Sequence, residues 1–218
     1  MALSGAVLFG FVVVHMLGNL KLFTGEQHFN DYAVFLRTVG EPALPHGALL
    51  WVTRVTLLAC VGVHLVAALQ VWAQSRRART TRYRQHDDLS FSYASRTMRW
   101  GGVIIVAFVV YHLLHLTVGV AHHDFVGADD PQAWAGHVNA YRNVVSGFRV
   151  PWVSVAYMLA MIPLGLHVYH GLWSATQTLA VKNPKLIKWR RPAAAVLATL
   201  IMLGNMSIPL AVLGGLVR

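Results

Sequence analysis

The chain has 218 residues, of which 56% are hydrophobic and 12% are charged, and its formal net charge is +10. Ordinary soluble domains carry about twice that share of charged residues, so the composition argues against a soluble protein. The basic residues lie between long apolar runs, which is typical of the cytoplasmic face of a membrane protein rather than of a nucleic-acid-binding surface. We therefore expect membrane lipids as neighbours and no nucleic-acid partner.

Five apolar runs are long enough to cross a membrane as helices. A hydrocarbon core about 30 Å thick requires roughly 20 apolar residues. Only helices or closed barrels satisfy backbone polar groups in lipid, and runs of this length are too long for barrel strands. The expected spans cover approximately residues 4–23, 49–72, 100–121, 152–176 and 193–217. The sequence therefore predicts an all-α integral membrane bundle of five transmembrane helices, forming a single domain over residues 1–218.

The loops between these spans differ in charge. Loops 73–99 and 179–192 carry 12 of the 18 basic residues, whereas loops 24–48 and 122–151 carry six of the eight acidic residues. The positive-inside rule then places the two basic loops and the N-terminus in the cytoplasm, and the C-terminus outside. The basic loops could contact lipid headgroups or dock a cytoplasmic protein, and their charge does not decide between the two.

The lone cysteine, Cys60, lies inside the second apolar run. One cysteine forms neither an intrachain disulfide nor a cysteine-ligated iron–sulfur cluster, and the chain has no CxxCH motif for covalent haem attachment. Any redox cofactor must therefore be held by other side chains, and we expect Cys60 to fill the core.

Histidines occur within four of the five expected spans. A single membrane histidine usually makes an interhelical hydrogen bond or lines a polar cavity. Four helices that each offer one near mid-membrane instead favour haem bound between two neutral imidazoles. The histidines of the spans are His15, His64, His112, His115, His167 and His170.

The depth of each histidine suggests how they pair. At 1.5 Å per residue, His15 and His112 lie about 2 Å outside the membrane midplane, and His64 and His167 lie about 5 Å inside it. This predicts an outer pair, His15 with His112, and an inner pair, His64 with His167.

His115 and His170 each follow a predicted ligand by three residues, on nearly the same helix face. Either could replace its neighbour as ligand, bind a haem propionate or serve a quinone. Spacing alone does not choose between them.

Five stretches of the chain form a recognisable set of motifs: VHMLGNLKLF (14–23), FNDYAVFLRT (29–38), SYASRTMRWGGVI (92–104), YHLLHLTVG (111–119) and LGLHVYHGLWSATQTL (164–179). Together they resemble the single-chain cytochrome b subunit of succinate dehydrogenase/fumarate reductase. The resemblance implies an anchor in the bacterial cytoplasmic (inner) membrane, with two haem b groups, beneath a flavoprotein subunit and an iron–sulfur subunit. Electrons from succinate would then reach a quinone, typically menaquinone. The alternatives are the anchor of another quinone-linked dehydrogenase, fumarate reduction in the reverse direction, and a haem-free transporter or proton channel.

The same resemblance implies which histidines bind iron. His15 and His112 are expected to hold the outer haem, and His64 and His167 the inner haem. It leaves His115 and His170 as secondary candidates.

In this family an outer-side carboxylate can take part in quinone protonation, which makes Glu26 and Glu41 the candidates here. A solvated loop acid is the simpler interpretation of each, since loops are usually polar and exposed. Arg54, near the outer end of the second span, could pair with a haem propionate or extend its charge to the interface.

Overall fold

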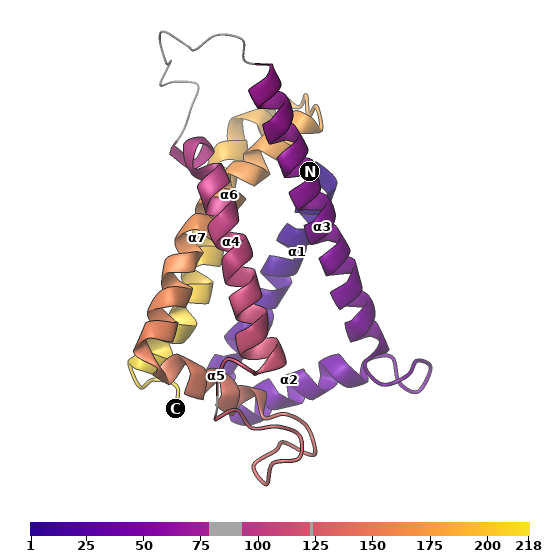
Figure 1. The fold of residues 1–218 in the computed structure, drawn as a ribbon, viewed down its shortest axis with the longest axis vertical. Helices are drawn as coiled ribbons and strands as arrows, with labels where there is room; N and C mark the ends of the chain where they lie inside the picture. The colour runs from indigo at the N-terminus through magenta and orange to yellow at the C-terminus, as the bar shows by residue number, and fades with distance from the viewer. Residues whose placement is uncertain (79–92, 123) are drawn as a thin grey trace.

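The computed structural model describes residues 1–78, 93–122 and 124–218, and the side chains of residues 93–96 are not described. Long helices dominate the described part of the chain, and several of them run the length of the molecule (Figure 1). In chain order the elements are α1 (Ala2–Asn19), η1 (Leu20–Thr24), α2 (Glu26–Thr38), α3 (Ala48–Arg77), α4 (Tyr93–His112), η2 (Leu113–Val118), α5 (Ala140–Arg149), α6 (Pro151–Thr178) and α7 (Pro184–Leu213).

Five helical segments are long and apolar enough to cross a membrane. They are Ala2–Thr24, Ala48–Arg77, Thr97–Val118, Pro151–Thr178 and Pro184–Leu213. The predicted fold class, an all-α membrane bundle of five transmembrane helices, is confirmed, and the chain is a multi-pass membrane protein.

The second and fifth spans differ most from their predicted bounds, and the second, α3, continues to Arg77 rather than ending at 72. The fifth, α7, begins at Pro184 rather than at 193, because Pro184 suits the first helical turn and the Asn183 side chain accepts a hydrogen bond from the backbone N–H of Lys185 at 3.0 Å. The first turns of α7 contain lysines and arginines, so a criterion based only on apolar residues left them out of the predicted span. The third span continues beyond α4 as the π-helix η2, a wider turn than an α-helix makes.

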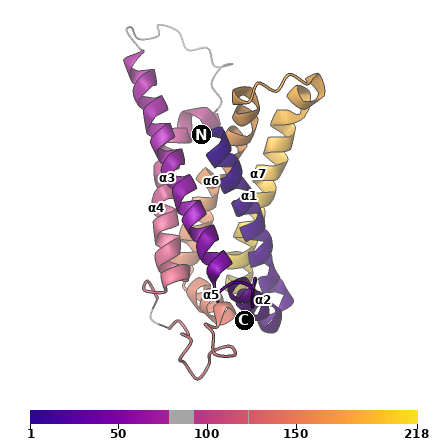
Figure 2. The same cartoon turned by 90° about the vertical axis from the view of Figure 1, so that its right-hand side faces the viewer.

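The loops expected at 24–48 and 122–151 contain two further helices, α2 and α5, that were not predicted. Each is too short and too polar to register as a membrane span. Figures 1 and 2 show both at the same end of the bundle, where α2 runs across the ends of the long helices. We call this the α2–α5 end.

Buried asparagines hold α2 and α5 together. Asn30 Nδ2 donates to Asn139 Oδ1 at 3.0 Å, and the backbone N–H of Tyr141 donates to Asn30 Oδ1 at 3.0 Å. Asn139 Nδ2 also donates to Glu26 Oε1 at 2.9 Å. Leaving a buried polar group without its partner costs about 1–3 kcal/mol, so this network fixes the register of α2 on α5.

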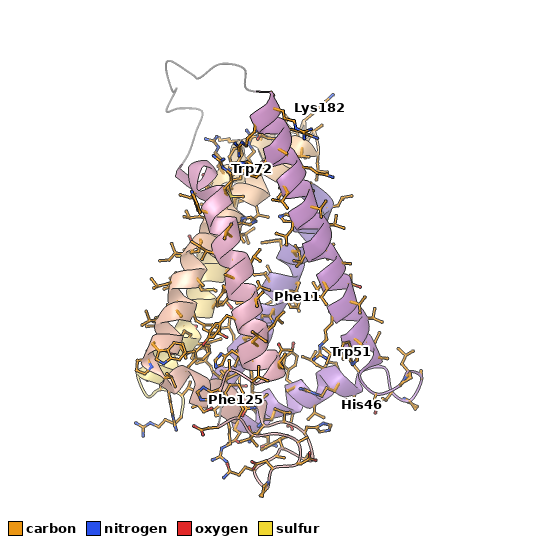
Figure 3. All side chains as sticks on the ribbon, in the orientation of Figure 1. Phe11, His46, Trp51, Trp72, Phe125 and Lys182 are labelled. Carbon is orange, nitrogen blue, oxygen red and sulfur yellow. The ribbon has the colours of Figure 1, made fainter. Side chains whose placement is uncertain are left out.

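Among the described side chains, the opposite end carries the larger share of the basic ones, from residues 76–77, 99 and 182–191, and we call it the basic end. Figure 3 shows Trp72 and Lys182 at this end and Trp51 at the α2–α5 end. The two classes of loop therefore lie at opposite ends of the bundle, although which end faces the cytoplasm stays a prediction. Arg79, Arg82 and Arg84 of the basic loop lie outside the described residues.

The five spans are packed unequally. Helix α6 contains buried residues from Val153 to Val168 and packs against α4 and α7. Helix α3 packs chiefly against α1 and α2, and none of its 30 described residues is buried. Figures 1 and 2 show α3 at the periphery, diverging from α4 towards the α2–α5 end. One transmembrane helix thus has few partners within the chain.

Candidate haem-binding site

The first histidine pair joins α1 to α4. The ring centroids of His15 and His112 lie 5.8 Å apart, with an interplanar angle of 86°. Phe11, one helical turn before His15, stacks on its ring at 5.2 Å, and Phe108 contacts His112 at 5.9 Å. Aromatic rings thus flank both imidazoles.

The second pair joins α3 to α6. The ring centroids of His64 and His167 lie 6.1 Å apart, with an interplanar angle of 60°. Nδ1 of His167 is buried and has no hydrogen-bond partner among the described residues. A buried polar atom without a protein partner is uncommon and leaves a position for a water, an ion or a ligand group.

The two pairs lie at different depths. His64 contacts the start of α1, at Ser4 and Gly5, whereas His15 lies eleven positions further along that helix than Ser4. At 1.5 Å per residue this corresponds to about 16 Å along the bundle, with the His15–His112 pair nearer the α2–α5 end. The structure brings together the same partners that the depth estimate paired.

The spacing within each pair fits a metal held between two imidazoles. With metal–nitrogen bonds of about 2 Å and each ring centre roughly 1 Å behind its nitrogen, the two centroids should be about 6 Å apart. The observed 5.8 Å and 6.1 Å agree with this value. The residues present therefore fit bis-histidine ligation at both positions.

One histidine of each pair is oriented through Nδ1 by a hydroxyl. Nδ1 of His64 lies 3.3 Å from Ser4 Oγ, and this hydroxyl donates to the carbonyl oxygen of Met1 at 3.1 Å. Ser4 Oγ is therefore left to accept the Nδ1 proton of His64. Nδ1 of His112 lies 3.3 Å from the hydroxyl of Tyr157. Such contacts fix the tautomer and leave Nε2 for a metal.

The secondary candidates lie in different surroundings. His115 is fully buried, at 0% exposure, between Phe125 and Phe148, and its histidine neighbour is His122 in the loop that follows η2. This packing leaves no open ring face for a macrocycle. Figure 3 shows Phe125 beside α5, at the end of the bundle.

His170 lies on α6 near the basic end and contacts the ring of Trp173 at 5.1 Å. Its Nδ1 and Trp173 Nε1 are buried without hydrogen-bond partners among the described residues. The guanidinium of Arg191 lies 4.8 Å from the centre of the Trp173 ring. His170 is therefore closer in character to a polar neighbour of the second pair than to a member of it.

The two carboxylates named as quinone candidates both have partners. Glu26 accepts a hydrogen bond from Asn139 and so contributes to the contact between α2 and α5. Glu41 is exposed, and its Oε1 lies 2.9 Å from Nδ1 of His46. Both lie at the α2–α5 end, as the sequence predicted for one side of the membrane, and their role towards a quinone stays a prediction.

Two arginines lie close together where α2 approaches α3. Burial and the positive charge of Arg54 lower the pKa of Arg37. The described residues place no carboxylate within 4 Å of either guanidinium, and Arg54 stacks against Trp51 at 4.9 Å. Arg37 Nη1 donates to the carbonyl oxygen of Ala33 at 2.6 Å, so no described carboxylate balances the charge of either arginine.

Sequence reasoning missed Ser4 and Tyr157, which contact the paired histidines. Each is a polar residue inside an apolar span, but at 1.5 Å per residue the predicted spans place Ser4 about 9 Å from the depth of His64 and Tyr157 about 8 Å from that of His112. Depth alone would therefore not have found either contact. No protein-family model, curated protein or solved structure gives a significant match to this chain.

Proposed function

We propose that the chain is the membrane-anchoring, di-haem cytochrome b subunit of a succinate:quinone oxidoreductase. The observation that carries the proposal is that four different helices bring their histidines together in two pairs, at the spacing a bis-histidine iron requires. Bound haem would supply one-electron transfer between the partner subunits and a quinone.

The residues of this chain divide between the two positions. His15 and His112, whose rings meet between α1 and α4, would hold one haem, and His64 and His167, between α3 and α6, would hold the other. The Nδ1 contacts of His64 and His112 orient the imidazoles before a cofactor arrives, which lowers the entropy lost on binding.

The sparse packing of α3 supports a large apolar ligand. A helix of 30 residues with none buried gains little from the rest of the chain, yet it contributes a histidine to a pair. A flat macrocycle between α3 and α6 would provide the apolar contacts that α3 otherwise lacks.

Charge supports the positions of the other partners. The basic end is proposed to face the cytoplasm of a bacterium and to dock the iron–sulfur subunit, above which the flavoprotein subunit lies. The quinone, proposed to be menaquinone, would approach the α2–α5 end, where Glu26 and Glu41 are candidates for proton exchange. Arg37 and Arg54 would hold a propionate carboxylate at this end. Succinate as the donor is supported by the motif resemblance.

Purification of the chain together with its natural partner proteins tests the proposal. A reduced-minus-oxidised optical spectrum should show a b-type haem band, and pyridine haemochrome analysis should give two haems per chain. Flavin and iron–sulfur clusters should co-purify, and succinate should reduce the haem.

The two parts of the proposal can fail separately. Well-folded protein without a reducible b-type band would overturn the haem assignment. A di-haem protein that co-purifies without flavin would retain that assignment and overturn the succinate partner.

A further inference from the structure

A single tyrosine hydroxyl connects two histidines of the third span. Tyr157, on α6, is only 7% exposed. Its hydroxyl oxygen lies 3.3 Å from Nδ1 of His112 and 2.9 Å from Nδ1 of His115. The Tyr157 hydroxyl therefore links His112, a predicted iron ligand, to His115, which the sequence spacing left as an alternative ligand.

The directions of these hydrogen bonds follow from the chemistry of the groups. A neutral imidazole that binds iron through Nε2 carries its proton on Nδ1, so His112 donates to the oxygen of Tyr157. The hydroxyl proton of Tyr157 is then free to donate to Nδ1 of His115. His115 then carries its proton on Nε2, which is the tautomer that accepts at Nδ1, and this Nε2 is buried beside Gly147 without a hydrogen-bond partner among the described residues.

The surroundings of His115 hold it in this position. Its ring stacks on Tyr111 at 5.6 Å with an interplanar angle of 11°. On helix α5, a Cβ added at Gly147 would lie 2.8 Å from Nε2 of His115, so only a glycine at this position lets α5 and the His115 ring pack this closely. His115 also lies in the π-helix η2, and such departures from α-helical geometry are frequent at functional sites.

We propose that Tyr157 is the positioning residue of the His15–His112 haem, and that His115 acts through it as a hydrogen-bond acceptor rather than as an iron ligand. The inference rests on the proposed haem function. By accepting the Nδ1 proton of His112, Tyr157 increases the electron donation of that imidazole and so favours the ferric state. His115 strengthens the effect because it polarises the Tyr157 hydroxyl.

Redox titration of the purified complex, monitored optically and by electron paramagnetic resonance, tests this role. Tyr157→Phe should retain both haems, raise the midpoint potential of one haem and shift its low-spin signal, while the other haem is unchanged. His115→Leu should give a smaller shift of the same haem in the same direction. His115→Asn, whose amide oxygen can accept in place of Nδ1, should restore the wild-type potential.

Tyr111→Phe is the matched control. Tyr111 lies beside the same rings, 5.9 Å from Tyr157 between ring centroids, but its buried hydroxyl has no hydrogen-bond partner among the described residues. Removing that hydroxyl should leave both potentials unchanged.

Each outcome decides the inference. Unchanged potentials in a di-haem Tyr157→Phe complex, or an equal shift in Tyr111→Phe, would overturn it and leave the haem proposal intact. If Tyr157→Phe does not fold, wild-type behaviour of both His115 variants overturns it instead. A wild-type complex without haem would refute the proposed function itself, and the inference with it.

Discussion

The two histidine pairs differ in how much protein surrounds them. His112 lies against a buried tyrosine and a cluster of aromatic side chains, on a helix that packs closely against α6. His64 lies on α3, which has no buried residue, and its described side-chain hydrogen bond is with Ser4. The first site is shaped by the chain itself. If the proposed haem binds at the second pair, it supplies contacts that α3 lacks, so haem binding and helix packing should be coupled far more strongly there.

The largest expected effect is on haem content, and it distinguishes His112 as an iron ligand from its neighbour His115. His112→Ala removes a proposed iron ligand and should leave one haem per chain, because the remaining imidazole of His15 would not hold a haem alone. His115→Ala should retain two haems. Pyridine haemochrome analysis of purified protein measures both, and two haems in His112→Ala would show that His112 is not a ligand.

Removal of haem should affect the loosely packed pair next most strongly. Cys60, the single cysteine of the chain, precedes His64 by one helical turn on the same face of α3. Haem depletion should accelerate its labelling by a membrane-permeant maleimide on the order of tenfold, which corresponds to about 1.4 kcal/mol of local stabilisation.

A cysteine elsewhere provides the control for this labelling. Thr199→Cys in a Cys60→Ala background places a thiol at an exposed position of α7. Its labelling rate should not depend on haem. Equal rates at Cys60 with and without haem would contradict the idea that α3 is held by its cofactor.

The smallest expected effect concerns the orientation of His64. Ser4→Ala removes the acceptor for its Nδ1 proton and should raise the midpoint potential of that haem alone. One hydrogen bond of about 1 kcal/mol corresponds to roughly 40 mV for a one-electron couple. Thr53→Ala also removes a hydroxyl bonded to a backbone carbonyl, but one that touches no histidine, and should change neither potential.

The parts of the fold that the sequence predicted are those governed by length and hydropathy. Five apolar runs correspond to five long helices, and even a crude depth estimate pairs His15 with His112 and His64 with His167. Helices α2 and α5 were not predicted, because a search for long apolar runs does not detect short amphipathic helices. The first turns of α7 were missed because their lysines and arginines extend the helix beyond its apolar portion.

The choice between His112 and His115 lay beyond sequence periodicity. Both residues occupy nearly the same face of a regular helix, and only tertiary contacts distinguish them. The π-helix η2, the close approach of Gly147 and the hydroxyl of Tyr157 arise from α5 and α6 packing on the third span. None of these leaves a signal in the spacing of the histidines.

The contact between Asn30 and Asn139 joins residues 109 positions apart, which bears on the order of assembly. The chain is synthesised from its N-terminus, so the Asn30–Asn139 hydrogen bond can form only after the third span has entered the membrane. His15 and His112 can meet at the same stage, whereas His64 must wait for His167 on the next span. The two histidine pairs are thus completed one after the other during biogenesis, and the pair that includes α3 is completed last.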